Sequence, residues 1–277
     1  MDPTTNGPLC DYNRSPAEID RLTGRLIDTA GTATDDRFVC YRLDGTDEFS
    51  DIGRQIEREV FEATFTGNDA DLMVREYGPY ERASLFFLSV DRLQRRPVGA
   101  LRIVGNSPAG LKTVNDLTSA QLPVRLTREQ IQEGHRIDDW DSCWDVATVA
   151  VAPDYRRAIA NTTLQLYRGM YVSALEHHID HLIAIIDKAP LLAMTDYLSI
   201  PFTPLCQTGY FPYLESAESR AVHGFVPDFH PIITARLSEL RDDPVAVRAL
   251  SYIILGTHDQ TLLFDRRPVS TPEDSSR

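Results

Sequence analysis

The sequence predicts a mixed α/β fold in which one twisted sheet is flanked by helices. Segments with the apolar period of strands and segments with the period of helices alternate between residues 38 and 226. Two crossovers between predicted strands, residues 144–186 and 186–214, are long enough to contain the helix that parallel pairing requires. The chain has 277 residues, of which 42% are hydrophobic and 25% charged, so it can bury a sizeable core without disulfides.

The first part of the chain predicts a short helix, a strand, a long helix and a hairpin. Ser15 and Pro16 are typical of the N-cap and first turn of a helix, and apolar residues then recur at helical spacing. The predicted elements are a helix over 16–29, a strand over 38–43, a helix from Ser50 to the turn at Gly67, a helical turn over 70–77, and paired strands at 84–90 and 98–104.

Residues 105–143 are polar and irregular, with one predicted helix over 127–133. A segment of this length is too long for an idle loop, so we interpret residues 108–143 as an insertion that acts as a lid or binds substrate. Beyond it, the patterns predict strands at 144–151, 181–186, 205–214 and 220–226, helices at 158–177, 190–198, 232–241 and 244–255, and a disordered tail from residue 266. We divide the chain into an N-terminal arm with a short helix (1–37), an α/β domain (38–228) and a C-terminal helical extension with a tail (229–277).

The charge and cysteine content exclude several classes of protein. Acidic side chains outnumber basic ones by 41 to 28, which gives a formal charge of −13. Nucleic acids and anionic membranes bind positive surfaces, so neither is expected as a partner. The four cysteines form no CxxC pair and no zinc-ligand pattern, and their scatter suits a reducing compartment. The first ten residues lack the pattern of a signal peptide, and no apolar run approaches roughly 18 residues, so we expect a cytoplasmic protein.

Residues 149–160 read VAVAPDYRRAIA, which predicts a strand, a turn and the start of a helix. This segment resembles the GNAT acyltransferase superfamily. In that family the strand binds pantetheine through backbone groups, and an R-x-x-G-x-G/A loop holds the cofactor pyrophosphate at a helix N-terminus. Alanines replace the usual glycines here, and Tyr155 stands at the first basic position. The residues that the resemblance assigns to cofactor binding are Val149, Val151, Arg156, Arg157, Ala158 and Ala160.

Two further segments strengthen the resemblance. Ala193, Tyr197 and Phe202 match the family's A-x-x-x-Y-x-x-x-G-F motif, with Pro in place of Gly, and in many members that Tyr protonates the departing thiolate. Residues 144–151, WDVATVAV, resemble the W-E-x-S-R-F-x-V strand of acyl-homoserine-lactone synthases and long-chain N-acyl amino acid synthases, with Thr148 at the Arg position. Matches to other motifs of this branch are GALR at 99–102, Tyr80-Glu81 at a Y-D pair, and the helix-borne Phe61.

The resemblance implies a GNAT-like, mostly antiparallel twisted sheet and an N-acyl transfer reaction. The donor would be an acyl-CoA or an acyl carrier protein thioester, the acceptor a small amine such as an amino acid, and no metal would take part. The implied catalytic residues are Tyr197, Asp145 and Glu81. The implied substrate-binding residues are Arg102, Phe61, Thr148 and Trp144. An acidic carrier protein would need basic side chains to dock, for which Arg54, Arg58, Arg156 and Arg157 are candidates.

Each of these residues also has a purely structural interpretation. Arg102 lies in an apolar strand, where a charge is usually paired, so it forms an ion pair with Glu81 or Asp145, or orients a carboxylate or phosphate, or both. Asp145 is either the acceptor-side base or an exposed acid at the start of a strand. Glu81 is alternatively a solvated residue of a turn, and Tyr197 a packed core tyrosine. Arg156 and Arg157 alternatively belong to a solvated turn.

Other patterns are weaker. His177, His178 and His181 straddle a predicted helix end, where histidines are favourable, and Asp138, Asp139 and Asp141 lack the further ligands of a calcium loop, so no metal site is expected. The sequence contains no GxSxG, Walker A or GxGxxG motif, which argues against hydrolase, P-loop and dehydrogenase functions. The rival to an acyltransferase is a catalytically inactive GNAT-fold binding or regulatory module. A different reaction on a CoA thioester has no sequence feature of its own.

Overall fold

One mixed sheet organises the part of the chain that the computed structural model describes, residues 11–30, 37–155, 159–240, 243–255 and 263–265. The strands are β1 (Phe38–Asp44), β2 (Ser84–Asp91), β3 (Arg96–Gly105), β4 (Cys143–Val151), β5 (His181–Asp187), β6 (Thr203–Pro204), β7 (Phe211–Tyr213), β8 (Ser216–Phe225) and β9 (Leu263–Asp265). Their order is β6-β8-β5-β4-β3-β2-β1-β9, with β7 paired to β8. The pairs β4–β5 and β1–β9 are parallel, and the other pairs are antiparallel.

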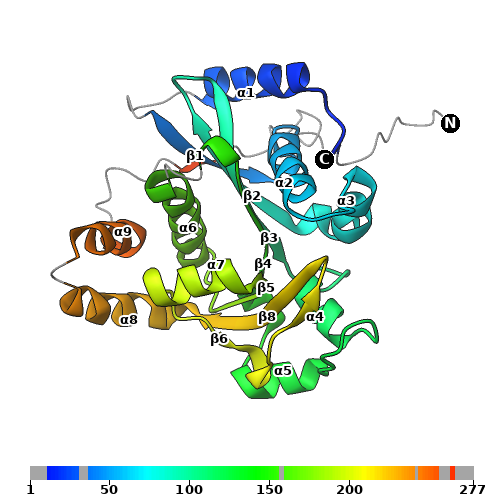
Figure 1. Cartoon of the computed structure of the whole chain (residues 1–277), viewed down its shortest axis with the longest axis vertical. Helices are drawn as coiled ribbons and strands as arrows, with labels where there is room; N and C mark the ends of the chain where they lie inside the picture. The colour runs from blue at the N-terminus through cyan, green and yellow to red at the C-terminus, as the bar shows by residue number, and fades with distance from the viewer. Residues whose placement is uncertain (1–10, 31–36, 156–158, 241–242, 256–262, 266–277) are drawn as a thin grey trace, which may run out of the picture.

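Helices cover both faces of this sheet (Figure 1). They are α1 (Pro16–Ala30), α2 (Ser50–Thr64), α3 (Ala70–Tyr77), α4 (Lys112–Thr118), α5 (Arg128–His135), α6 (Ile159–Glu176), α7 (Lys188–Leu192), α8 (Val226–Glu239) and α9 (Pro244–Leu255). Helices α6, α8 and α9 pack on one face, where Leu101, Trp144 and Leu182 belong to the largest apolar core. Helices α1 and α2 pack on the other face against residues such as Phe86 and Ala100. No helix in the described residues is long and apolar enough to cross a membrane.

The predicted elements up to residue 104 and from 144 to 187 are confirmed, with small differences at their ends. The predicted strand over 205–214 is wrong. Cys206 and Gln207 both have positive φ, at 46° and 58°, so the chain turns there and only Phe211–Tyr213 forms a strand. Helix α8 starts at Val226 rather than 232 and carries Pro231 inside it. The tail from residue 266 lies outside the described residues.

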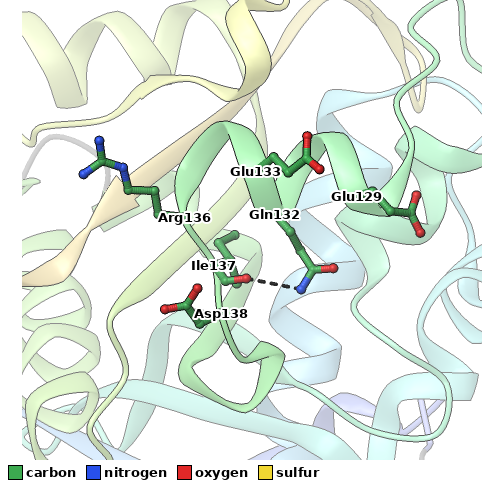
Figure 2. A pocket seen from close by; sticks show the side chains of 6 residues that line it. All are labelled: Glu129, Gln132, Glu133, Arg136, Ile137 and Asp138. Atoms are coloured by element: carbon green, nitrogen blue, oxygen red, sulfur yellow. Dashed lines mark hydrogen bonds between the residues drawn. The ribbon is translucent and has the colours of Figure 1, made fainter.

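The insertion 108–143 folds into α4 and α5 and packs a small core of its own. Leu117, Ile131 and Trp140 are buried there against Ile183 of β5 and Phe211 of β7. The sequence missed α4 and indicated only α5. A hollow of about 630 Å³ beside α5 and the loop that follows it is lined by residues of the insertion, and none of the predicted site residues lines it (Figure 2). The segment is therefore a packed part of the fold, since its apolar side chains complete the core under β5 and β8.

Three histidines join the insertion to the sheet. His181 Nδ1 of β5 lies 3.0 Å from His223 Nε2 of β8, and the rings of His223 and His135, at the end of α5, have centroids 4.2 Å apart. The backbone N–H of Cys206 donates to His135 Nε2 at 2.8 Å. Burial lowers the pKa of all three imidazoles, and that of His223 falls to about 3. Asp180 and Asp138 oppose the shift at His181.

We expect acid to destabilise this junction. The folded-state pKa values are lowered, so below about pH 6.5 the unfolded chain binds more protons, and the free energy of unfolding falls as the pH falls through this window. In thermal melts, His223→Gln should reduce the loss of Tm between about pH 7 and pH 5, because one contributing group is removed. The matched control is His230→Gln, an exposed histidine of α8. The same pH dependence in H223Q and the parent would contradict the assignment.

Candidate functional site

Strands β4 and β5 part in the middle of the sheet. Their parallel pairing runs only from Cys143 opposite His181 to Asp145 opposite Ile183. Beyond this point β4 continues to Val151 and β5 to Asp187, and each stays paired to its outer neighbour, β3 or β8. The C-terminal halves of β4 and β5 therefore run without backbone hydrogen bonds between them. A gap of this kind offers strand-edge backbone groups to an extended ligand.

A β-bulge in β4 shapes the face of the sheet that carries α2. Arg102 lies opposite Thr148 and Ile103 opposite Val146, so Ala147 is the extra residue. A bulge re-aims the side chains around it and increases the local twist. Here Ala147 and Thr148 both meet residues of the α2 side, with Ala147 packed beside Tyr12, Met73 and Tyr77 and Thr148 bonded to Glu57.

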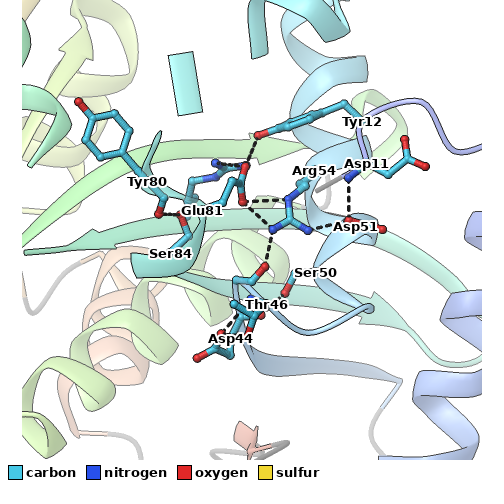
Figure 3. Close-up of polar contacts among 12 residues, drawn as sticks. Asp11, Tyr12, Asp44, Thr46, Ser50, Asp51, Arg54, Tyr80, Glu81 and Ser84 are labelled. Atoms are coloured by element: carbon cyan, nitrogen blue, oxygen red, sulfur yellow. Dashed lines mark hydrogen bonds and ion pairs between the residues drawn. The ribbon is translucent and has the colours of Figure 1, made fainter. Parts of the chain in front are cut away.

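A set of four charged residues is buried between α2 and the sheet; we call Arg54, Glu57, Glu81 and Arg102 the buried ionic cluster. Arg102 donates to both Glu57 oxygens, at 3.1 and 2.6 Å, and to Glu81 Oε1 at 3.1 Å. Arg54 donates to Glu81 Oε2 and to the Gly45 carbonyl oxygen, and pairs with Asp51 at 2.6 Å. Figure 3 shows Arg54 and Tyr12 converging on Glu81. All four cluster residues are at most 3% exposed.

The two carboxylates of the cluster respond differently to burial. Burial raises the pKa of Glu57, and the Arg102 guanidinium and the hydroxyl donated by Thr148 only partly offset this. Burial acts in the same direction on Glu81, but the guanidiniums of Arg102 and Arg54 outweigh it and lower the pKa of Glu81. Glu81 is thus held ionised, and it is poorly suited to accept a proton near neutral pH.

The close approach of α2 to the sheet makes the cluster possible. A Cβ at Gly53 would lie 2.7 Å from the Phe86 ring, so only glycine allows α2 to sit at this depth. Arg54, Glu57 and Phe61 then recur at i, i+3 and i+7 and share one side of the helix. This spacing is the sequence signal that could have revealed Glu57 as the partner of Arg102.

Asp145 lies in a separate buried position. It is 0% exposed, accepts the Thr113 backbone N–H at 2.5 Å and accepts the Thr113 hydroxyl at 2.9 Å. Burial raises its pKa to about 7, although the hydrogen bonds from Thr113 and the charge of Lys112 oppose the shift. A buried carboxyl poised near neutral pH can exchange a proton with a reacting amine. The alternative prediction of an exposed acid at the start of the strand is wrong.

Lys112 connects the surroundings of Asp145 to the buried ionic cluster. Its ammonium donates to Glu76 and Asp116 at 2.8 Å and to the Tyr213 hydroxyl at 3.0 Å. The Tyr77 ring lies between the two positive groups, 5.4 Å from Lys112 Nζ and 4.6 Å from the centre of the Arg102 guanidinium. Sequence analysis missed Lys112 and Thr113, because α4 was not predicted, and it did not single out Tyr77 at the end of the predicted turn 70–77.

The predicted substrate-binding residues do not form one pocket. Arg102 and Thr148 are turned inward to the cluster, and Arg102 pairs with Glu81 as expected but with Glu57 rather than Asp145. Trp144 is buried on the opposite face, with its ring centroid 5.6 Å from that of His177. Phe61 is half-buried beside Phe65. The interpretation of Glu81 as a solvated turn residue is wrong, since it is 3% exposed.

The predicted cofactor-binding residues are only partly described. Val149 and Val151 are half-buried in β4 along the parted edge. Arg156, Arg157 and Ala158 lie outside the described residues; for Ala160 only its place in α6 is described.

Tyr197 ends a π-helical turn, Ala193–Tyr197, that continues α7. Such turns are frequent at functional sites. In the described residues, no group of three or more His, Cys, Asp or Glu is arranged to hold a metal ion.

Comparisons with known proteins give matches to solved structures only. No protein-family model and no curated protein matches the sequence. The structure of FeeM, an N-acyl amino acid synthase from uncultured soil microbes, aligns with a TM-score of 0.51 and 19% identity over 71% of this chain and 94% of that chain. Lower TM-scores of 0.43 and 0.45 are found for BjaI, a CoA-dependent acyl-homoserine lactone synthase (14% identity, 77% and 88% covered), and the AHL synthase LasI (10%, 68% and 89%).

The similarity to FeeM covers 71% of this chain, and the GNAT-like fold predicted from the sequence is confirmed. The motifs at 144–151, 99–102, 80–81 and Phe61 resemble both the acyl-homoserine-lactone synthases and the long-chain N-acyl amino acid synthases, and the aligned FeeM is an N-acyl amino acid synthase.

The raised pKa of Asp145 generates a stability prediction. A folded-state pKa above the unfolded value means that folding favours the protonated carboxyl, so this stability is present at low pH and lost as the pH rises through about 7. Asp145→Asn keeps an oxygen for the Thr113 N–H and removes the buried charge. At about pH 8 the variant should be more stable than the parent by about 1–3 kcal/mol, and near pH 5 the difference should shrink. Chemical denaturation at both pH values measures this; a variant less stable at both would refute it.

Proposed function

We propose that the chain is an N-acyltransferase that moves an acyl group from a thioester donor to the amine of a small acceptor such as an amino acid. The observation that carries this proposal is the parting of β4 and β5 after Asp145 and Ile183, in a sheet with the fold of FeeM. An extended pantetheine arm fits a gap between two strands, because it carries amides that pair with strand edges. Along the chain, the motif around Val149 belongs to β4 and the motif around Tyr197 follows β5, which is their order in the acyltransferases.

The donor would enter along the parted edge. Val149 and Val151 of β4 would hold the pantetheine arm, and the pyrophosphate of an acyl-CoA would lie at the N-terminus of α6, near Arg156, Arg157, Ala158 and Ala160. Unpaired N–H groups and a partial positive charge favour an anion there. Arg54 cannot serve as a docking residue for a carrier protein, since it is 0% exposed. Arg58, Arg156 and Arg157 remain the candidate docking residues, and both acyl-CoA and a carrier-protein thioester remain candidate donors.

The chemistry needs a base and an acid on opposite sides of the thioester. The acceptor nitrogen attacks the thioester carbon, a C–N bond forms, the C–S bond breaks, and the products are an amide and a free thiol. A backbone N–H near Val149 would polarise the carbonyl. Asp145, with its pKa near 7, would take the proton of the amine through water, and Tyr197 would protonate the sulfur. Glu81 is the weaker candidate base, because two arginines lower its pKa.

The second candidate is a GNAT-fold module that binds a thioester without turnover. The observation that favours it is the loop at 155–160, in which alanines replace glycines. The methyl groups of the alanines keep a phosphate farther from the backbone N–H groups of the loop than glycines would. Binding without catalysis would follow if the donor is held but not oriented.

One assay separates the two candidates. The protein is incubated with acyl-CoAs of several chain lengths, with and without a pool of amino acids, and free thiol is followed. Thiol release that depends on the amine and yields an N-acyl product by mass spectrometry supports the transferase. Binding of acyl-CoA with no release over the full panel supports the module, and neither binding nor release refutes both.

The proposed acid is tested by Tyr197→Phe, which removes a hydroxyl and little volume. If the hydroxyl protonates the thiolate, turnover should fall by about 10²–10⁴-fold while Tm is nearly unchanged. A tyrosine that only packs and hydrogen-bonds would instead cost about 1–3 kcal/mol of stability and leave turnover per folded molecule intact. Turnover and Tm measured on one preparation distinguish these outcomes, and Tyr210→Phe, an exposed tyrosine outside the motif, is the control.

A further inference from the structure

The buried ionic cluster is closed to solvent. Arg102 and Glu57 are 0% exposed and Glu81 is 3% exposed. Most of its walls are α2, β3, β4, the turn Gly78–Ala83 that carries Glu81, and the rings of Tyr77 and Phe86. Helix and sheet hydrogen bonds hold most of these elements in place. No dissolved molecule can touch Arg102 or Glu81 unless one wall moves.

The remaining wall is a short segment that precedes α1. Tyr12 is 1% exposed, and its hydroxyl donates to Glu81 Oε1 at 2.9 Å and accepts from Arg102 at 2.6 Å (Figure 3). Its ring packs in a small apolar cluster with Met73 and Tyr77, against the bulge residue Ala147. Tyr12 thus contacts both the cluster and the bulge residue of β4.

This segment, Asp11–Arg14, is held mainly through side chains. The Asp11 N–H donates to Asp51 Oδ1 at 3.2 Å, Arg14 pairs with Asp51 at 2.5 Å, and Arg58 donates to the Asn13 side chain at 3.2 Å. It lies outside the helices and the sheet. Moving it breaks these polar contacts and exposes the Tyr12 ring, whereas moving α2 or β3 would break many helix or sheet hydrogen bonds, so the segment is the wall that costs least to open.

We propose that residues 11–14 are a displaceable cover and that a zwitterionic α-amino acid takes the place of Tyr12. When the phenol leaves, Arg102 loses an acceptor and Glu81 loses a donor. A carboxylate replaces the first and an ammonium group the second. One hydroxyl oxygen now reaches both groups within 2.9 Å, so they are close enough for a single amino-acid head group. The identification of this ligand as the acyl acceptor rests on the proposed function. The displacement of residues 11–14 by an amino acid does not depend on it.

The cover is tested on the whole protein labelled with 3-fluorotyrosine. Of its eleven tyrosines, the resonance of Tyr12 is assigned by its absence in Tyr12→Phe. We expect one or more of the twenty amino acids, at millimolar concentration, to move this ¹⁹F resonance toward that of free 3-fluorotyrosine. The matching decarboxylated amine and N-acetyl amino acid, which each lack one charge, should leave it in place. Faster tryptic cleavage after Arg14 of the unlabelled protein is an independent readout of the same opening.

Loosening the cover should strengthen binding, because less free energy is spent on opening it. Arg14→Ala removes the partly exposed pair with Asp51 and should lower the apparent Kd of the amino acid by about two- to fivefold. The control is Arg25→Ala on α1, which breaks an exposed ion pair between Arg25 and Glu48 and should leave the Kd unchanged.

The proposal is overturned if the Tyr12 resonance keeps its chemical shift with all twenty amino acids. It is also overturned if the singly charged analogues shift this resonance as far as the amino acid does. The two hypotheses fail separately. Release of Tyr12 by an amino acid without any thiol release would keep the cover and reject the transferase. Amine-dependent thiol release with Tyr12 fixed throughout would keep the transferase and reject the cover.

Discussion

A buried arginine determines how this face of the molecule is built. Arg102 stands in a central strand with no exposure, and its charge is held by the carboxylates of Glu57 and Glu81. Burying an ion is unfavourable unless it is paired and hydrogen-bonded, and removing one partner of such a pair costs about 3–5 kcal/mol. The depth of α2 at Gly53, the turn that carries Glu81 and the phenol of Tyr12 all serve the requirement that Arg102 be paired.

The same strand system supplies the gap on which the proposed function rests. Strand β4 is paired to β3 along its length and to β5 only at its start. The bulge at Ala147 lies close to where β4 and β5 part, and it turns Thr148 toward α2. A donor held along the parted edge and an acceptor approaching from the α2 face would therefore meet at the middle of β4. Asp145, next to this region, carries the carboxyl whose pKa is closest to neutral.

The insertion 108–143 holds Asp145 in place and is attached to the sheet at two polar contacts. Thr113, at the start of α4, donates both its N–H and its hydroxyl to Asp145, and Lys112 lies beside it with a buried ammonium. At its other end, the His135 ring lies against the tilted ring of His223 of β8. The insertion is thus attached at two polar points with opposite pH behaviour: burial raises the pKa of the carboxyl and lowers that of the imidazoles. Near neutral pH the His223 imidazole is uncharged, whereas the Asp145 carboxyl, with a pKa of about 7, is about half ionised.

The sequence by itself determined the order of strands and helices, because apolar periods and caps act locally, and it determined the GNAT-like fold through the motifs of β4 and Tyr197. It also indicated that Arg102 must be paired. It could not identify Glu57 or Tyr12 as partners, since they are 45 and 90 residues away from Arg102 along the chain. It missed α4, a short helix whose start is bonded to Asp145 of a distant strand. Local patterns decide which element a residue joins; only the packing of the sheet against α2 decides which charges meet and which pKa values move.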